Sequence, residues 1–376
     1  MQSMRRVRVL VIGQTPPPTH GQGIMIETLL RGPMPRVELR HVRMAYSERL
    51  VDVGKVRLGK LAHLASVLGR TLRACATFKP DVIYYPPAGP DLVPALRDAL
   101  TLLVIRRFAP RLVLHFHAGG LSELCERMRP AALRVLVRRG LSGADAAVML
   151  SAHNPPDGQY FAARRIYYVP YGIADQRDRF ASGADPARAP QVLHAGYVRE
   201  SKGVLDLTRA AAILWHRGRK FSLAFMGSCS AAVAESIRKI AGKHAGSVSL
   251  LGEQLGDAKW QVYADSDVFC FPTFYRAETF GLVCVEAMMF GLPVIATRWR
   301  GAQDIVEESR TGFLVPINDP EGLASRLEEL LGDTPLRCAM GEAGRKRYLE
   351  RYTLERYLAD MEQVFCDVTA DRVAVG

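Results

Sequence analysis

The feature that most constrains the fold is an alternation of short apolar segments with longer helical patterns, which occurs twice along the chain. In the first half, short apolar segments lie at residues 8–13, 81–85, 111–117, 145–150 and 166–169. Helical patterns lie between them, at residues 62–78, 95–108 and 130–141. The second half repeats the arrangement, with apolar segments at residues 191–198, 222–226, 248–251, 268–271 and 294–297. Short buried strands that alternate with helices form parallel sheets of the doubly wound type. The sequence therefore predicts an α/β protein with two Rossmann-like units.

A charged segment at residues 175–190 separates the two halves. It is rich in Ala, Asp, Gly and Pro and has no periodic pattern, which is typical of a linker. We therefore expect an N-terminal domain over residues 1–174 and a C-terminal domain over residues 191–352. A last helical pattern starts at residue 353, and we expect residues 353–376 to pack back on the first domain.

The net charge of the chain is concentrated in its first half. Residues 1–180 hold 27 basic and 13 acidic side chains, a net charge of +14, whereas the remaining residues hold 23 and 25, a net charge of −2. A basic half favours an anionic partner, which could be nucleic acid, an anionic membrane leaflet or a phosphorylated substrate. Arginines between residues 127 and 139 alternate with apolar residues, as in a basic amphipathic helix at a membrane surface. A solvated helix face fits them nearly as well.

Seven cysteines are scattered along the chain, and none has a C-x-x-C spacing. This distribution argues against a disulfide framework and against a zinc site, and it favours a reducing compartment. The apolar segments are also too short for a signal peptide or a membrane span, so we expect neither.

Residues 277–293 carry the strongest functional signal. Seven residues lie between Glu278 and Glu286, and Gly281 precedes a short apolar helix that a Gly-Leu-Pro sequence ends. Because an ionised carboxylate is rarely buried without a partner, we expect Glu286 to face a polar cleft. The backbone N–H groups of residues 279–282 lie at the helix start, where they can bind an anion. The alternative is a core helix with a satisfied Glu286 and an exposed Glu278.

A glycine-containing loop follows the first apolar segment of each half. In the first half, Gly23 permits close approach of the backbone to a ligand. In the second half, residues 195–203 connect a strand to a helix, the place where α/β proteins bind ligands. Lys202 adds a positive charge there that suits a diphosphate. A simple turn at Gly23 and a solvated Lys202 are the alternatives.

Two histidines stand near the end of one predicted strand. Side chains alternate along a strand, so His115 and His117 lie on the same face. His117 is at the carboxyl end, next to the presumed crevice, and we interpret it as a site residue and His115 as a structural one. The spacing also suggests a metal, but no third ligand lies nearby in the sequence.

Together these segments resemble the retaining glycosyltransferases of the large family GT4, which have the GT-B fold. Glu278 and Glu286 match the family's E-x7-E motif, and residues 271–273 and 291–297 match the strands that flank it. Gly196 and Lys202 match its diphosphate loop, and His117 falls where the family has an active-site histidine.

Two positions depart from the pattern of this family. Tyr197 stands where the family usually has an arginine, and Arg199 could supply that charge instead. Tyr171 replaces an asparagine at the entry to the linker, and the role of Tyr171 is open.

The resemblance implies two Rossmann-like domains that face each other across a cleft, and transfer of a hexose from a UDP- or GDP-sugar with retention at the anomeric carbon. It implies no metal and no cofactor. The implied catalytic residues are Glu278 and His117. The implied substrate-binding residues are Gly23, Arg199, Lys202, Thr279, Phe280, Gly281, Leu282 and Glu286.

For the acceptor, the basic first half favours a lipid-diphosphate-linked glycan intermediate of polysaccharide biosynthesis. We therefore expect a cytoplasmic protein that is peripheral at the anionic inner face of the cell membrane. The alternatives are a soluble small-molecule acceptor, or a non-catalytic protein that binds a sugar nucleotide or an anionic polymer. We expect no nucleic-acid partner, because no stacking aromatics lie between the basic residues.

Overall fold

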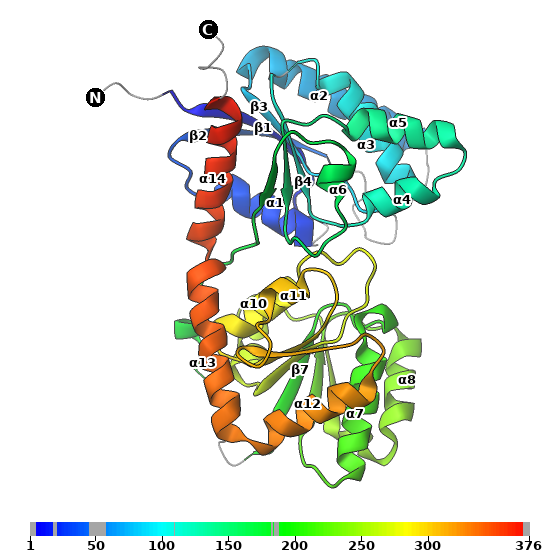
Figure 1. Cartoon of the computed structure of the whole chain (residues 1–376), viewed down its shortest axis with the longest axis vertical. Helices are drawn as coiled ribbons and strands as arrows, with labels where there is room; N and C mark the ends of the chain where they lie inside the picture. The colour runs from blue at the N-terminus through cyan, green and yellow to red at the C-terminus, as the bar shows by residue number, and fades with distance from the viewer. Residues whose placement is uncertain are drawn as a thin grey trace. The chain divides into compact units, whose positions relative to one another are not determined.

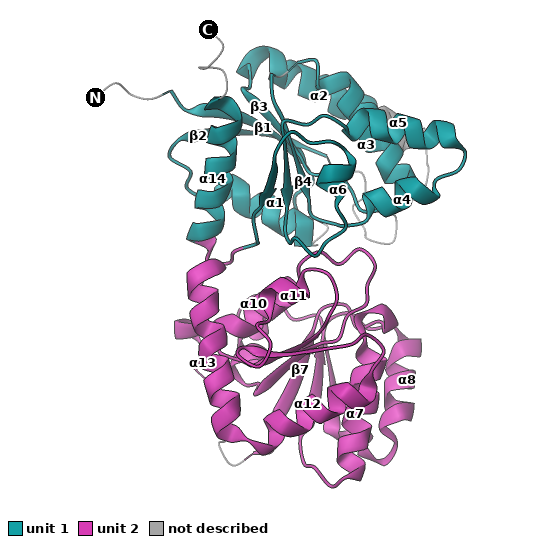
Figure 2. Cartoon of the chain, viewed as in Figure 1, with its two compact units in different colours: residues 1–171, 355–376 teal, residues 172–354 magenta. Residues whose placement is uncertain are grey.

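The computed structural model describes residues 5–17, 21–44, 58–108, 110–181, 183 and 188–370. The chain divides into two compact units, residues 1–171 with 355–376 and residues 172–354 (Figure 2). The division therefore falls after Tyr171 and again after Leu354, and the described part of residues 175–190 lies in the second unit.

The first unit is built on a six-stranded parallel sheet in the order β2-β1-β3-β4-β5-β6 (Figure 1). Its strands are β1 (Val7–Gly13), β2 (Val37–Arg43), β3 (Val82–Tyr85), β4 (Leu112–Phe116), β5 (Ala146–Met149) and β6 (Ile166–Tyr168). Its helices are α1 (Gly21–Arg31), α2 (Leu58–Phe78), α3 (Leu92–Ile105), α4 (Leu121–Arg127), α5 (Ala131–Leu141), α6 (Asp157–Tyr160) and α14 (Leu354–Ala370), the last of which begins at the unit boundary.

The two faces of this sheet are both buried, because its central strands are continuously apolar. Leu10 and Ile12 of β1 contribute to a core with residues of α2, α3 and α5. Tyr84 of β3 points to the opposite face, where its ring packs edge-on against Phe365 of α14. The last helix therefore covers a face of the first sheet.

Polar contacts fix α14 to the first unit. Glu362 accepts hydrogen bonds from the backbone N–H of Arg36 at 2.6 Å and from its Nε at 3.1 Å. Arg111 donates from Nε to the carbonyl oxygen of Val368 at 3.0 Å. A glutamate that is nearly buried is satisfied by these two donors, as a buried carboxylate requires.

The second unit holds another six-stranded parallel sheet, in the order β12-β11-β10-β7-β8-β9. Its strands are β7 (Gln191–Ala195), β8 (Ser222–Met226), β9 (Val248–Gly252), β10 (Val268–Phe271), β11 (Val294–Thr297) and β12 (Gly312–Val315). Its helices are α7 (Val204–His216), α8 (Ala231–Ala241), α9 (Gly256–Ala264), α10 (Leu282–Met289), α11 (Ala302–Ile305), α12 (Pro320–Gly332) and α13 (Thr334–Arg351). Three 3-10 turns complete the second unit, at Arg177–Arg179, Glu200–Lys202 and Gly242–Ser247.

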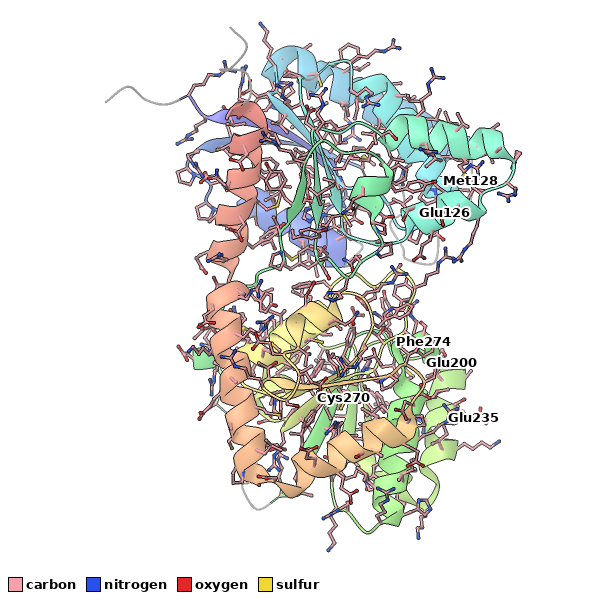
Figure 3. The ribbon with its side chains drawn as sticks, in the orientation of Figure 1. Glu126, Met128, Glu200, Glu235, Cys270 and Phe274 are labelled. Carbon is pink, nitrogen blue, oxygen red and sulfur yellow. The ribbon has the colours of Figure 1, made fainter. Side chains whose placement is uncertain are left out.

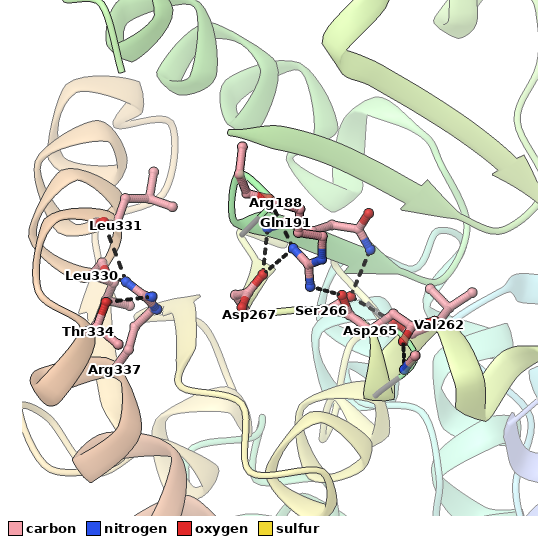
Figure 4. Close-up of polar contacts among 12 residues, drawn as sticks. Arg188, Gln191, Val262, Asp265, Ser266, Asp267, Leu330, Leu331, Thr334 and Arg337 are labelled. Carbon is pink, nitrogen blue, oxygen red and sulfur yellow. Dashed lines mark hydrogen bonds and ion pairs between the residues drawn. The ribbon is translucent and has the colours of Figure 1, made fainter. Parts of the chain in front are cut away.

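An aspartate and an arginine fix the start of this second sheet (Figure 4). Asp267, just before β10, accepts a hydrogen bond from the backbone N–H of Gln191 at 2.7 Å and one from Arg188 at 2.7 Å. Arg188 also donates to the carbonyl oxygen of Asp265. These contacts join the start of β7 to the start of its neighbour β10 and set the register of the pair.

The predicted α/β fold with two parallel sheets is confirmed, and the differences lie in elements with weak patterns. The edge strand β2 was not predicted, because charged residues interrupt its sequence VELRHVR and only Val37 and Val42 are buried. The first helix begins at Gly21, so Gly23 lies in its first turn and not in a loop.

Candidate functional site

The helix α10 places Glu286 in the interior of the second unit. Glu286 is 4% exposed, and every other residue of this helix is apolar. One carboxylate oxygen accepts a hydrogen bond from Nζ of Lys259 at 2.5 Å, and the other accepts one from the hydroxyl of Tyr263 at 2.7 Å. Burial, and then the charge of Glu286, raises the pKa of Tyr263 well above its usual value, so the hydroxyl keeps the proton it donates. Glu286 thus has partners on both oxygens, and each oxygen retains a lone pair for a further donor.

Lys259 and Tyr263 come from α9 and were not identified from the sequence. They are four residues apart, so they project from one face of this helix. Lys259 also lies 4.4 Å from the ring centre of Trp260. A lysine and a tyrosine at this spacing, shortly before the strand that leads into the glutamate motif, are the signal that could have revealed them.

Glu278 lies in the loop before α10 and forms an ion pair with Lys202. The distance from Nζ of Lys202 to the carboxylate of Glu278 is 2.5 Å, and both side chains are 13% exposed. The structure therefore brings together two residues that stand 76 positions apart in the sequence. A ligand that carries both a diphosphate and hydroxyl groups could bind Lys202 through its phosphates and Glu278 through its hydroxyls.

Arg199 belongs to the same cluster through an aromatic ring. Its guanidinium lies 4.2 Å from the ring centre of Tyr275, and Nζ of Lys202 lies 5.0 Å from the same ring. Arg199 also lies 5.6 Å from the ring of Tyr197. The cations of Arg199 and Lys202 thus both lie over the ring of Tyr275, a residue that the sequence analysis did not single out. The arrangement gathers positive charge where the sequence predicts a diphosphate.

The loops that carry these residues are held together by close backbone contacts. A Cβ atom at Gly203 would lie 2.0 Å from the carbonyl oxygen of Pro272, so only glycine fits between the two loops. The backbone N–H of Phe274 donates to the carbonyl oxygen of Ser201 at 3.0 Å. Figure 3 accordingly shows Phe274 beside Glu200, the first residue of the turn that holds Lys202. This contact fixes the position of Lys202 relative to the strand that precedes Glu278.

The start of α10, where the sequence predicts an anion site, is formed by a glycine and buried residues. Gly281 caps this helix with a φ of +86°, a conformation that side chains other than glycine rarely adopt. Thr279 and Phe280 are buried just before it, and Leu282 is the first residue of the helix. The predicted substrate-binding residues of the second half thus lie together at the carboxyl ends of β7 and β10, which are neighbours in the sheet.

In the first unit, His117 belongs to a buried cluster of polar rings. The hydroxyl of Tyr84 lies 2.8 Å from Nδ1 of His115 and 3.0 Å from Nε2 of His117. The hydroxyl of Tyr171 contacts Nδ1 of His117. The two imidazoles are stacked with their ring centres 4.0 Å apart. Tyr171, whose role the sequence left open, therefore contacts the histidine that the sequence singled out.

The protons of this cluster are constrained by burial. Burial raises the pKa of Tyr84 well above its usual value and lowers that of His115 to about 3, so Tyr84 keeps its proton and His115 is neutral. Tyr84 can donate to only one histidine and must accept from the other. Nε2 of His115 has no partner among the described residues, and a buried acceptor tolerates this better than a buried N–H. The favoured chain therefore runs from His115 through Tyr84 and His117 to Tyr171.

Gly23 is the remaining predicted site residue of the first unit. It is buried in the first turn of α1, after the strand β1. Gly23 and His117 thus belong to the first unit, and the other predicted site residues belong to the second.

Comparison with known proteins supports a relationship to glycosyltransferases. Residues 175–347 match the family described as glycosyl transferases group 1. The chain is 30% identical over 304 residues to the sulfoquinovosyl transferase SQD2 of Arabidopsis thaliana, a match that covers 75% of this chain and 56% of that protein. The chain spans about half the length of the curated relatives it matches.

Solved structures agree over almost the whole chain. A sucrose-phosphate synthase from Thermosynechococcus elongatus matches with a TM-score of 0.73 and 21% identity, covering 97% of this chain and 100% of that one. Anabaena Alr3699/HepE in complex with UDP matches with a TM-score of 0.71 and 19% identity, covering 96% and 100%. These likenesses show the fold, which is of the GT-B type.

Among the residues that the structure describes, no helix is both long and apolar enough to cross a membrane. In the same residues, no three or more His, Cys, Asp or Glu side chains are grouped so that they could hold a metal ion.

Proposed function

We propose that this chain transfers a hexose from a UDP- or GDP-sugar to an acceptor hydroxyl, with retention at the anomeric carbon and without a metal. Its residues 175–347 match the group 1 glycosyl transferases. The observation that carries the proposal is the ion pair between Lys202 and Glu278, next to Arg199 and the start of α10. The domain match alone indicates the class of protein. The ion pair adds charged side chains that are suited to binding a sugar diphosphate.

The donor diphosphate would take Lys202 away from Glu278. Lys202, Arg199 and the backbone N–H groups at the start of α10 would then stabilise the negative charge that develops on the leaving group, which is electrostatic catalysis. Glu278, released from its lysine, would be free to contact the donor sugar near the reacting carbon. The ion pair gives the carboxylate a partner before the substrate arrives.

Glu286 would accept hydrogen bonds from the ribose of the donor. Lys259 and Tyr263 hold the carboxylate in place, so the ribose would meet a fixed acceptor. The role of His117 stays the predicted one, contact with the donor sugar, and Tyr84 and Tyr171 would fix the orientation of its ring.

The experiment that tests this function is the release of UDP or GDP from a panel of nucleotide sugars in the presence of EDTA. Release from one sugar nucleotide that is lost in the Glu278→Gln protein supports the proposal. If no sugar nucleotide releases its diphosphate but UDP or GDP binds, the alternative of a non-catalytic sugar-nucleotide binding protein is the better interpretation.

For the acceptor, we propose a lipid-diphosphate-linked glycan reached at an anionic membrane surface. The motivation is the charge of residues 1–180 and the outer face of α5, where Arg138, Arg139 and Val135 are exposed. Each basic residue near an anionic surface contributes about 1 kcal/mol, so a few suffice for reversible docking.

A vesicle co-sedimentation assay tests this docking. Binding should require anionic lipid, weaken with added salt and fall when Arg134, Arg138 and Arg139 are changed to glutamate. A charge-matched control changes three exposed residues of the second unit, Arg238, Lys239 and Lys243, to glutamate. Equal binding to neutral vesicles, or an equal loss in the control, would favour a soluble small-molecule acceptor.

A further inference from the structure

A basic pocket lies in the first unit, lined by residues of the edge strand β2 and the helix α2, and none of the residues assigned to the donor lines it. The strand and the helix are labelled in Figure 1. Its volume is about 400 Å³, within the range of pockets that bind small molecules. The polar side chains that line it are Arg40, His41, Arg43, Arg70, Arg73 and Thr77.

No described residue neutralises the positive charge of this pocket. Among the residues that the structure describes, no acidic side chain lines the pocket, and Arg40, Arg43, Arg70 and Arg73 form no ion pair. His41 is affected by the same charges: burial lowers its pKa first, and the charges of Arg43 and Arg70 lower it further. Four like charges around one cavity repel one another, and an anion between them would remove that cost.

The arginines are held in place by contacts that leave donors available. Arg43 donates from Nη2 to the carbonyl oxygens of Thr15 and Pro17, and Arg70 donates to the carbonyl oxygen of Arg43 at 3.1 Å. Each guanidinium has five N–H donors, so these bonds use only some of them. Nε of Arg43 is buried and donates to no described residue.

The two remaining arginines differ in how they are fixed. Arg40 donates to Oγ1 of Thr77 at 3.0 Å and lies 4.8 Å from the ring centre of Phe78. Arg73 is exposed, and its guanidinium makes no hydrogen bond or ion pair with any residue that the structure describes. The pocket thus combines anchored guanidinium groups with one that can move onto a ligand.

We propose that the pocket between β2 and α2 binds a phosphoryl group, most readily a diphosphate. A single carboxylate is satisfied by one arginine in a bidentate pair, whereas a diphosphate offers enough oxygens and charge for four. Under the proposed function, this phosphoryl group belongs to the acceptor. That assignment rests on the proposed function, whereas the binding of a phosphoryl group does not.

Charged residues on an edge strand can also serve to prevent pairing between copies of a sheet. That explanation accounts for Arg40 and Arg43 on β2. It does not account for Arg70 and Arg73, which lie on a helix and face the same cavity. It also predicts a different result, because removal of the charges would then cause aggregation without loss of anion binding.

Calorimetric titration of the full chain with inorganic pyrophosphate tests the proposal. The variant is Arg70→Gln with Arg73→Gln, because both side chains are exposed on α2 and their loss should leave the fold intact. Lys202→Ala is combined with it, since Lys202 is expected to bind pyrophosphate in the second unit. We expect the two changes on α2 to weaken one binding event at least about 10-fold, whether or not Lys202 is present.

Controls make the outcomes distinct. Arg6→Gln with Arg107→Gln removes two exposed arginines elsewhere on the first unit and should leave pyrophosphate affinity unchanged. The proposal is overturned if the α2 variant binds pyrophosphate as the parent does, or if the control loses as much. Failure of Lys202→Ala to weaken binding would instead count against the donor site, and thus against the proposed function.

A second arm identifies the source of the phosphoryl group. Co-sedimentation with phosphatidylcholine vesicles, with and without phosphatidic acid, is compared for the parent and the α2 variant. If the variant loses both pyrophosphate affinity and binding to phosphatidic acid, the pocket takes a lipid headgroup. If it loses pyrophosphate affinity alone, the pocket takes a soluble phosphoryl group.

Discussion

Replacing Lys259 by methionine should destabilise the second unit, because Glu286 would lose its charged partner. The side chain of Glu286 is 6% exposed and that of Lys259 is 25% exposed. Breaking a fully buried ion pair by removing one partner costs about 3–5 kcal/mol, whereas an exposed pair contributes about 0–1 kcal/mol. Lys259 is partly screened by solvent, and Tyr263 still donates to the carboxylate, so we expect a loss of about 2 kcal/mol.

Thermal unfolding followed by fluorescence measures this loss. A domain of 150–250 residues shifts its Tm by about 2–4 °C per kcal/mol, so Lys259→Met should lower the Tm of the second unit by roughly 4–8 °C. The double variant with Glu286→Gln should recover most of it, because the uncompensated charge is removed. Lys239→Met, at an exposed position of α8, is the matched control and should change little.

Two results would refute this reasoning. An unchanged Tm in Lys259→Met would mean that solvent reaches Glu286 easily, so that the ion pair contributes nothing. A double variant as unstable as Lys259→Met would mean that the lysine acts through its packing on Trp260 rather than through its charge.

Three further predictions concern the charged and buried groups. Glu278→Gln should lower kcat on the order of 10²-fold or more while the fold and donor affinity survive, because the residue lies in a loop; near-full turnover in a steady-state assay would contradict its role. Lys202→Ala should weaken UDP or GDP binding in calorimetry, since the charge acts on the diphosphate in ground and transition states alike, and an unchanged Kd would exclude that contact. Burial lowers the folded-state pKa of His115 to about 3, so below about pH 6.5 the unfolded chain binds a proton that the folded chain does not. The contribution of neutral His115 to the free energy of unfolding is therefore complete above that pH. It falls towards pH 3 by up to about 1.4 kcal/mol per pH unit. Denaturant titrations at several pH values should show a smaller fall for His115→Asn, and parallel curves would show that His115 is not responsible.

The order of strands and helices was largely predictable, and the exceptions have local causes. Buried strands such as β5 and β10 are continuous apolar runs, so their positions follow from the pattern alone. The edge strand β2 carries charges on a partly solvated strand and gives no such signal. The helix α9 mixes polar and aromatic residues without a clear apolar face, so the i, i+4 spacing of Lys259 and Tyr263 was the one local signal for the partners of Glu286.

The residues of the candidate site were proposed from the sequence, but their contacts could not be. The E-x7-E spacing and the loop with Lys202 were visible in the sequence. Glu286 was expected to face a polar cleft, whereas the structure buries it with Lys259 and Tyr263 as partners, which is the satisfied Glu286 of the alternative. The contacts of Arg199 and Lys202 with the ring of Tyr275 join residues from different loops. The contact between the hydroxyl of Tyr84 and His115 joins residues from different strands. No local pattern encodes such contacts, because they depend on which strands are neighbours.

The sequence by itself determined that the chain forms two parallel sheets, because strand and helix periods are local properties of the side-chain pattern. It also determined which loops carry glycine, lysine and glutamate. Only the tertiary structure decided that Lys202 meets Glu278 across 76 positions of sequence and that Lys259 meets Glu286 across 27. For the first pair the physical reason is strand order: β7 and β10 pair in parallel, so their carboxyl ends share one edge of the sheet and the loops that follow them come into contact. For the second pair it is the packing of α9 and α10, the helices that precede and follow β10.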